Sequence, residues 1–424
     1  MAVLFIVFIV LLLIGAPIFV SLGGASLVYT AFLSNIPDFV VLHRMAGGVD
    51  SFPLLAVPFF ILAGNLMNTA GITNRIYDFA ASAVGWLRGG LGHVNVVGSV
   101  IFAGMSGTAV ADAGGLGNIE IKAMRDHGYS AEFAVGITAA SSTIGPIIPP
   151  SLPMVVFGVM ANVSIGQLFA AGIVPGLVMA LAMMIYVSWY ARRNGIGRDQ
   201  TFRLRALGSS FLRAIPALIT PVIIIGGMTS GAFTPTEAAV AACAWAMLLG
   251  IVLYRSLTLR QFYRVTIETI EMTAAVLIIV GAASLFGWVL TTTRVTEAIT
   301  QVLLSITSDP LLLLIIINIL LLIVGCFMET IAAISILVPI LMPAAVQAGI
   351  DPVQFGVVMV LNLMIGLLTP PVGMVLFVLS RVAKLSFDRT VMAVLPFLVP
   401  LLVVLVLISV FPPLTLWLPT LWYR

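Results

Sequence analysis

The chain has 424 residues, of which 61% are hydrophobic and 8% are charged, and its formal net charge is +3 at pH 7. A soluble domain carries about 25% charged residues, so this composition excludes an ordinary soluble fold and makes a lipid bilayer the solvent for most of the chain. The apolar runs also exceed the roughly ten-residue alternating strands of a membrane barrel, so we expect helices and roughly a dozen membrane passes or half-passes.

The first half of the chain contains five apolar segments, near 2–32, 53–70, 94–105, 133–160 and 165–191. The first has neither a basic leader nor a clean cleavage site, so we expect a retained span rather than a removable signal peptide. The segment 94–105 is too short to cross a bilayer, and it runs into the polar, glycine-rich stretch 106–117. An apolar half-helix entering such a stretch predicts a re-entrant hairpin.

An arginine-rich connection at 192–213 separates the two halves. Its position beside apolar spans is typical of a cytoplasmic loop. No face combines basic and aromatic residues, which argues against a nucleic-acid partner. The chain also lacks a phosphate-binding loop and a His-Glu-x-x-His helix, so we expect neither ATP hydrolysis nor another enzymatic activity.

The second half contains apolar segments near 216–232, 236–254, 271–291, 311–327, 353–380 and 391–418. A second hairpin is predicted where Pro310–Phe327 is followed by Met328–Pro343. An internal repeat supports the pairing, because Gly145-x-x-x-Pro149-Pro150 returns 221 residues later as Gly366-x-x-x-Pro370-Pro371, and the same offset carries Gly104 onto Gly325. Chance in a proline-rich chain is the alternative. Paired interruptions of this kind are the best sequence indication of a transporter's binding site.

The two helix breaks predict cation sites. Proline removes a backbone donor and glycine relaxes the helix, so the carbonyls of Gly145, Ile148 and Pro149 lose their partners inside the membrane. A bare sodium ion fits such carbonyls. The first hairpin adds oxygens, and these belong to Ser106, Thr108 and Asp112.

The second break predicts a related but unequal cation site. Under the 221-residue offset, Glu329 falls at the position of Thr108 and Thr369 at that of Ile148. Asp112 and Glu329 could instead cap helices or bridge to the scaffold. Carboxylates are costly in membranes and usually functional there, which favours a functional role.

Candidate substrate contacts lie beside the breaks. Ser141, Ser142 and Thr143 precede the first break and Asn362 precedes the second, although such side chains equally bond one helix to another. Arg294 ends an apolar span, where it could clamp a carboxylate or extend to the membrane interface; position alone favours the interface.

Three motifs in this order resemble the large membrane subunit of tripartite ATP-independent periplasmic (TRAP) transporters. They are Gly104–Asp112, Gly145–Ser151 and Gly366–Gly373, and length and the arginine-rich connection agree with them. Glu329 is a modest departure, since the family more often has aspartate there.

The resemblance implies an all-α polytopic membrane protein of the bacterial inner membrane, with two inverted repeats and an elevator-type transport domain moving on a scaffold domain. We expect the first repeat at 1–191, with a hairpin at about 91–128 and a broken helix at about 133–160. An amphipathic arginine-rich connection at 192–215 precedes the second repeat at 216–424, with a hairpin at about 311–345 and a broken helix at about 353–380.

The resemblance also implies sodium-driven import of an organic acid, such as a dicarboxylate or sialic acid. The partners would be a small four-helix membrane subunit and a periplasmic substrate-binding protein. Two or more sodium sites are implied, the first at Ser106, Gly145, Ile148 and Pro149, and the second at Gly325, Glu329, Gly366, Thr369 and Pro370. Arg294 gains weight as a carboxylate contact.

Three alternatives stay open at this point. A stand-alone sodium/carboxylate symporter would need no soluble partner. A membrane enzyme acting on a lipid-linked substrate would need a paired-carboxylate or metal motif at a helix end, and none is visible. A passive channel is disfavoured, because paired discontinuous helices favour alternating access.

Overall fold

The computed structural model describes residues 2–34 and 36–423, and every regular element in this part of the chain is a helix. Seven of these helices are long and apolar enough to cross a membrane, and a bent pair near residues 295–325 could supply an eighth span. Leucine, isoleucine, valine and phenylalanine side chains stay exposed along many of them, as expected where the surroundings are lipid. The predicted all-α polytopic membrane fold is therefore confirmed.

The N-terminal segment differs from the single span predicted near 2–32. It forms two helices, α1 (Ala2–Leu13) and α2 (Ile18–Leu33). Gly15 has a φ of +82° and Pro17 precedes α2, so the chain turns between them. α3 (Asp38–Val49), a short 3-10 turn (Phe52–Leu55), α4 (Ala56–Thr69) and α5 (Ile72–Val84) follow.

The first predicted hairpin and broken helix are present. The hairpin consists of α6 (Gly90–Ser106), α7 (Ala109–Gly114) and α8 (Leu116–Asp126), and the broken helix consists of α9 (Ala131–Ser142) and α10 (Leu152–Ala161). The long α11 (Ile165–Arg193) ends this half.

The arginine-rich connection predicted at 192–215 includes an irregular part and the start of a helix. Residues 194–203 are irregular, but α12 (Leu204–Thr229) begins inside the predicted range, because arginine, alanine and leucine there favour a helix. α13 (Pro235–Leu248), a π-helical turn (Leu249–Leu253), α14 (Leu259–Thr292) and α15 (Val295–Ile306) follow. Side chains cap α13 and α14 at Thr234 and Thr258.

The second hairpin and broken helix also appear. α16 (Pro310–Gly325) and α17 (Thr330–Gln347) make the hairpin, and α18 (Pro352–Gly366) and α19 (Met374–Ala383) make the broken helix. α20 (Phe387–Val410) and α21 (Pro413–Trp422) complete the described chain. α15 and α16 meet at a bend of 119°, which turns the chain back into the second hairpin.

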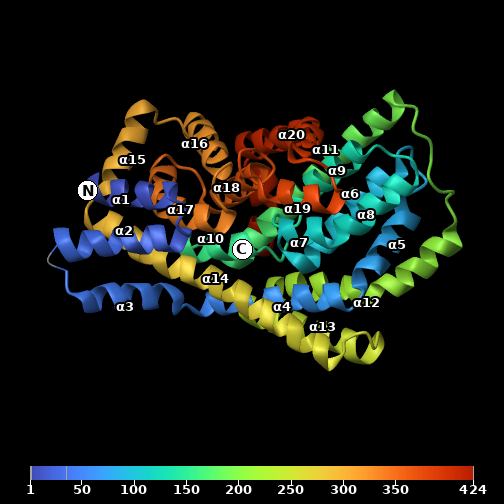
Figure 1. The fold of residues 1–424 in the computed structure, drawn as a ribbon, viewed down its shortest axis with the longest axis horizontal. Helices are drawn as coiled ribbons and strands as arrows, with labels where there is room; N and C mark the ends of the chain where they lie inside the picture. Colours follow the sequence, from blue (N-terminus) through green and yellow to red (C-terminus); the bar gives the residue numbers. More distant parts are fainter. Residues whose placement is uncertain (1, 35, 424) are drawn as a thin grey trace.

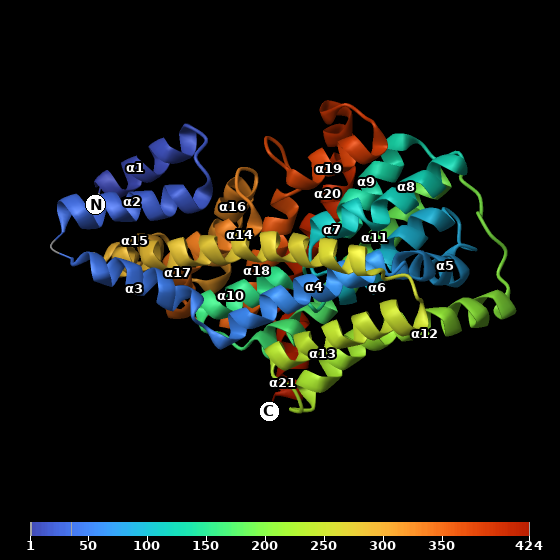
Figure 2. The ribbon, with the colours of Figure 1, turned by 60° about the horizontal axis from the view of Figure 1, so that its bottom comes forward.

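Two layers position the breaks. In Figure 1, α3, α4, α12, α13 and α14 lie along the lower side, and the hairpins and broken helices lie above them. Figure 2 shows α14 running along much of the molecule, and it packs against α3 and α4 as well as against the hairpin helix α17. Residues 353–366 of α18 and 133–142 of α9 are buried on every face, so the helices that lead into the breaks form the centre of the upper layer.

Candidate functional site

The tip of the first hairpin lies directly against the first helix break. Gly107, at the tip, has a φ of +63°, and a Cβ atom there would come within 2.7 Å of the Pro150 carbonyl oxygen. The Leu152 N–H donates a long hydrogen bond of 3.4 Å to the Gly107 carbonyl. Only glycine fits this approach, because a side chain would need both a strained backbone and space that Pro150 occupies.

Oxygen atoms gather beside Gly145. A Cβ atom built on this residue would lie 3.5 Å from the Thr108 carbonyl oxygen and 3.8 Å from the Ser106 hydroxyl oxygen. The Ser106 hydroxyl is buried and has no hydrogen-bond partner. Within the described chain, no donor reaches the carbonyls of Gly145, Ile148 or Pro149. These unpartnered oxygens need a positive group in a low-dielectric interior.

The second hairpin meets the second break in the same manner. A Cβ atom on Gly366 would come within 2.6 Å of the Gly325 backbone, so the two glycines allow the tip and the break to touch. The Val372 N–H donates to the Cys326 carbonyl over 3.2 Å and fixes the contact. The Thr369 hydroxyl donates to the Ile365 carbonyl over 2.9 Å. In both repeats the bond between the two prolines is cis.

The structure gives two of the candidate cation ligands a capping role. Thr108 caps α7, and its hydroxyl accepts a hydrogen bond from the Ala111 N–H. One carboxylate oxygen of Glu329 accepts from the N–H groups of Ile331 and Ala332 at the start of α17, over 2.9 and 3.1 Å. Capping accounts for the position of Glu329 without a cation. Asp112, by contrast, is buried and caps no helix.

A small cavity lies beside the first tip. Its volume is about 30 Å³, and Ser106 and Thr108 line it together with Asn65 and Asn68 of α4 and Met272 of α14. α4 packs tightly here, since a Cβ atom on Gly64 would lie 2.9 Å from the Met105 carbonyl oxygen. The first tip therefore contacts the lower layer as well as its own break.

The predicted polar substrate contacts lie inside the protein, where most of their polar atoms have partners, although the buried Oδ1 of Asn362 has none among the described residues. Ser142 and Thr143 donate to the carbonyls of Ala139 and Ala140, and Ser141 donates to the Asn95 side chain. The Asn362 amide donates to Asn318 of α16 over 2.8 and 2.9 Å. Asn362 thus joins α18 to the second hairpin.

Arg294 is not brought together with the other substrate candidates. It is exposed between α14 and α15 with a φ of +56°, and the described residues give its guanidinium no hydrogen bond or ion pair. α14 and α15 both pack against α17, so Arg294 lies beside the second hairpin rather than in a break.

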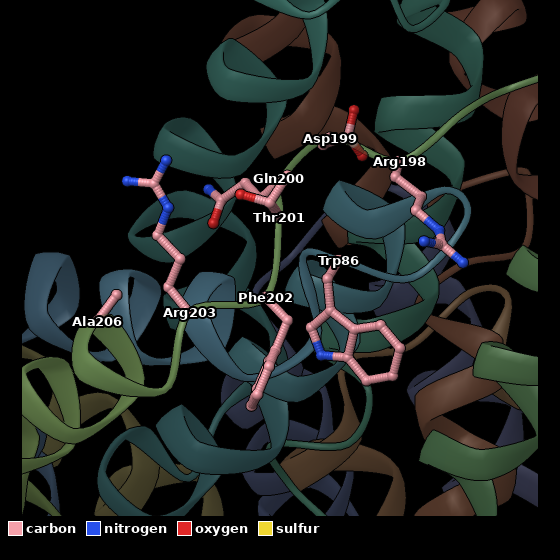
Figure 3. Close-up of a pocket in the computed structure, with 8 residues that line it drawn as sticks. All are labelled: Trp86, Arg198, Asp199, Gln200, Thr201, Phe202, Arg203 and Ala206. Atoms are coloured by element: carbon pink, nitrogen blue, oxygen red, sulfur yellow. The ribbon is translucent and has the colours of Figure 1, made fainter.

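A large pocket lies away from both breaks. Its volume is about 670 Å³, and it is lined by the irregular connection after α11 together with Trp86. Figure 3 shows the side chains of Arg198 and Arg203 extending to opposite sides, so the two charges do not converge on one ligand. We therefore place the candidate site at the breaks.

Sequence reasoning did not single out Asn95, Ser99 and Glu120. The structure buries all three within the first hairpin, at most 1% exposed, beside Asp112. The sequence did contain one indication of this cluster: Asn95 and Ser99 are four residues apart in a short apolar helix, so their side chains lie on the same face.

Comparison with known families identifies the chain. Residues 5–414 match the family model described as "Tripartite ATP-independent periplasmic transporter, DctM component". The chain belongs to this family. The match confirms the resemblance carried by the glycine–proline motifs, and the TRAP relatives are transporter permease proteins rather than enzymes.

Among curated TRAP proteins, the chain is similar to the sialic acid large permease protein SiaM of Vibrio cholerae, with 48% identity over 97% of this chain and 96% of that protein. It is 44% identical to the sialic acid permease protein SiaT of Haemophilus influenzae, over 98% of this chain and 67% of that protein. The Escherichia coli 2,3-diketo-L-gulonate large permease protein YiaN is 40% identical over 96% of each.

A solved structure shares the fold. The YdaH transporter of Alcanivorax borkumensis, described as having an unusual topology, superposes with a TM-score of 0.64 at 14% identity, over 96% of this chain and 98% of that one. At this identity the likeness concerns the fold alone.

Proposed function

We propose that this chain is the permease subunit of a sodium-driven importer of an organic acid anion in the bacterial inner membrane. The observation that carries the proposal is the double contact of a hairpin tip with a helix break. At Gly107 with Pro150, and at Gly325 with Gly366, backbones approach too closely for any side chain. Each contact sits beside a helix interruption, where transporters bind coupling ions.

Sodium ions would occupy the oxygens beside the two breaks. The first site would use Ser106 and the carbonyls of Gly145, Ile148 and Pro149, and the second would use the hydroxyl of Thr369 with the carbonyls of Gly325, Gly366 and Pro370. A cation held between a tip and a break would join the two, because each contributes oxygens to it. Its charge would also offset the cost of bringing an anion into the membrane.

The substrate we propose is a sugar acid, with sialic acid the first choice. Two relatives with 44% and 48% identity carry sialic acid in their names. Ser141, Ser142 and Thr143 already use their hydroxyl protons, so at a substrate they could only accept hydrogen bonds, as from sugar hydroxyls. The carboxylate needs a donor, and the candidate is the free guanidinium of Arg294, which lies apart from these hydroxyls in this structure and would approach the substrate in another state of the transport cycle.

The proposed assembly includes a small four-helix membrane subunit and a periplasmic substrate-binding protein. The chain covers 67% of SiaT, leaving roughly 200 residues of that protein, room for four spans of about 20 residues and their connections. The upper layer, built from hairpins and broken helices, would slide on the lower layer as an elevator, carrying ions and substrate together.

Uptake into proteoliposomes tests this proposal. The chain, co-expressed with its small membrane subunit, is reconstituted, and uptake of radiolabelled sialic acid is measured with an inward sodium gradient and with choline in its place. We expect accumulation only with sodium and only with the binding protein added. Accumulation without the binding protein would identify a stand-alone symporter, and equilibration without any cation gradient would identify a channel.

A further inference from the structure

A polar cluster lies between the first hairpin and α9. Its members are buried, at most 1% exposed, and they come from four packed helices: Asn95 and Ser99 of α6, Asp112 of α7, Glu120 of α8, and Thr138 and Ser141 of α9. Buried polar side chains at this density need a defined set of partners.

Hydrogen bonds account for only one side of the cluster. The Asn95 amide donates to Glu120 Oε2 and to Thr138 Oγ1, each over 2.7 Å. Ser141 donates to Asn95 Oδ1 over 2.6 Å. Both amide hydrogens of Asn95 are then used, so this side chain has no donor left for Asp112.

Four oxygen atoms are left without a partner. They are both carboxylate oxygens of Asp112, Oε1 of Glu120 and the hydroxyl of Ser99. Ser99 lies close enough to Asp112 to interact with it, although no hydrogen bond of normal geometry joins them, and the two carboxyl groups are close enough to interact electrostatically. A Cβ atom on Gly98 would lie 2.8 Å from Glu120 Oε1, so that oxygen points at α6, the helix that carries Ser99.

No basic side chain balances these carboxylates. Among the described residues, the ion pairs are Arg264 with Glu268 and Arg389 with Glu132, and neither involves Asp112 or Glu120. Two buried carboxylates without a positive partner are too costly to persist as such. One shared proton would supply a single donor, whereas a metal cation can contact several of these oxygens at once.

The second hairpin shows that the fold does not require the cluster. Under the 221-residue offset that relates the breaks, Ser99, Asp112 and Glu120 correspond to Leu320, Ala333 and Leu341. The second hairpin forms with apolar residues at all three positions. The polar residues of the first hairpin therefore serve something other than hairpin packing.

We propose that Ser99, Asp112 and Glu120 bind a further sodium ion inside the first hairpin. The ion would connect α6 with α7 and α8, the two arms of the hairpin. Ser99 precedes Ser106 by seven residues, about 10 Å along the helix, so this site is separate from the one beside Gly145. The inference rests on the proposed sodium coupling and adds a site that the second repeat lacks.

Equilibrium binding of radiolabelled sodium to the purified full chain in lipid nanodiscs tests the inference. We expect Asp112→Asn to bind one sodium ion fewer per chain than the wild type. Glu120→Gln should raise the half-saturating sodium concentration of one site by roughly tenfold, since a ligand bond to a charged group is lost. Asp126→Asn is the matched control, because it removes an exposed carboxylate from the same helix as Glu120 and should bind like the wild type.

Ser99→Ala keeps the test decisive if Asp112→Asn does not fold. It removes one neutral oxygen, and we expect a several-fold weaker single site with the others unchanged. If the variants that fold bind as many sodium ions as the wild type, with the same affinity, the inference is overturned. A proton shared by the two carboxyl groups would then explain the cluster. The two sites at the breaks and the transport proposal would stand in that case. Absence of any sodium binding by the wild type would overturn both proposals.

Discussion

Single oxygen atoms decide what the breaks can bind. The Ser106 hydroxyl is buried without a partner, whereas the hydroxyls of Ser142 and Thr143 donate to carbonyls of their own helix. A buried oxygen without a donor is a better cation ligand than one whose surroundings already satisfy it. In the part of the chain that the structure describes, the proposed carbonyl ligands of the first site have no hydrogen-bond donor. In the second site the Gly366 carbonyl already accepts a hydrogen bond from the Thr369 N–H.

Thr369→Ala tests the second cation site. The hydroxyl donates its proton to the Ile365 carbonyl, so its oxygen lone pairs remain free for a cation. We expect the half-saturating sodium concentration for uptake to rise roughly tenfold, with normal membrane insertion.

Thr390→Ala is the matched control for Thr369→Ala, because the Thr390 hydroxyl makes an equivalent bond to the Ser386 carbonyl, on α20. We expect it to keep wild-type sodium dependence. Equal sodium dependence of Thr369→Ala and the wild type in reconstituted uptake would remove Thr369 from the site.

Helix ends set the form of both hairpins. The first arm of each hairpin ends in a glycine-containing turn, and the returning arm starts at a side-chain cap, Thr108 or Glu329. A cap satisfies N–H groups that membrane surroundings would leave unpaired. The tips can therefore end inside the protein and leave oxygen atoms, rather than amide protons, facing the breaks.

Glu329 is the residue for which capping and cation binding make different predictions. Glu329→Gln keeps an acceptor for the N–H groups of Ile331 and Ala332, while Glu329→Ala removes it. We expect the alanine variant to lose about 1 kcal/mol of stability, measured by thermal unfolding in detergent. The glutamine variant should keep its sodium affinity within about twofold. The corresponding change in binding free energy is well below the roughly 1.4 kcal/mol that a tenfold change in affinity would require. A large loss of sodium affinity in Glu329→Gln would instead make its carboxylate a cation ligand.

The two layers contact each other at several places, and one of these is the tip of the first hairpin. Asn68 of α4 and Ala111 of α7 line the same small cavity there, one from each layer. An elevator requires this contact to break during each transport cycle, while contacts within a layer persist.

Cross-linking across the layers tests the sliding motion. With Cys243 and Cys326 replaced by alanine, cysteines at Asn68 and Ala111 are joined by a short thiol-specific reagent. We expect uptake to stop on cross-linking and to return on reduction, because the layers can no longer move apart.

The control pair joins two helices of the same layer. Asn65 of α4 donates to Thr269 of α14 over 3.2 Å, and cysteines at these positions should cross-link without affecting uptake. Full uptake with the Asn68–Ala111 pair cross-linked would rule out sliding at this contact.

The sequence by itself determined the membrane class, the two hairpins, the two breaks and the family. These features depend on local composition, such as apolar run length and paired Gly-x-x-x-Pro-Pro motifs, which act within one or two helical turns. The sequence did not determine the turn between α1 and α2, because two short apolar helices and one long span have the same composition.

Only the tertiary structure decided which oxygens are free. Thr108 and Asp112 share a helical face in sequence, yet Thr108 caps a helix while Asp112 joins Glu120 and Ser99. Ser141 and Asn95 are far apart along the chain but bond directly. Whether a buried polar atom has a partner depends on the helices packed against it, and that information exists only when α6, α7, α8 and α9 come together.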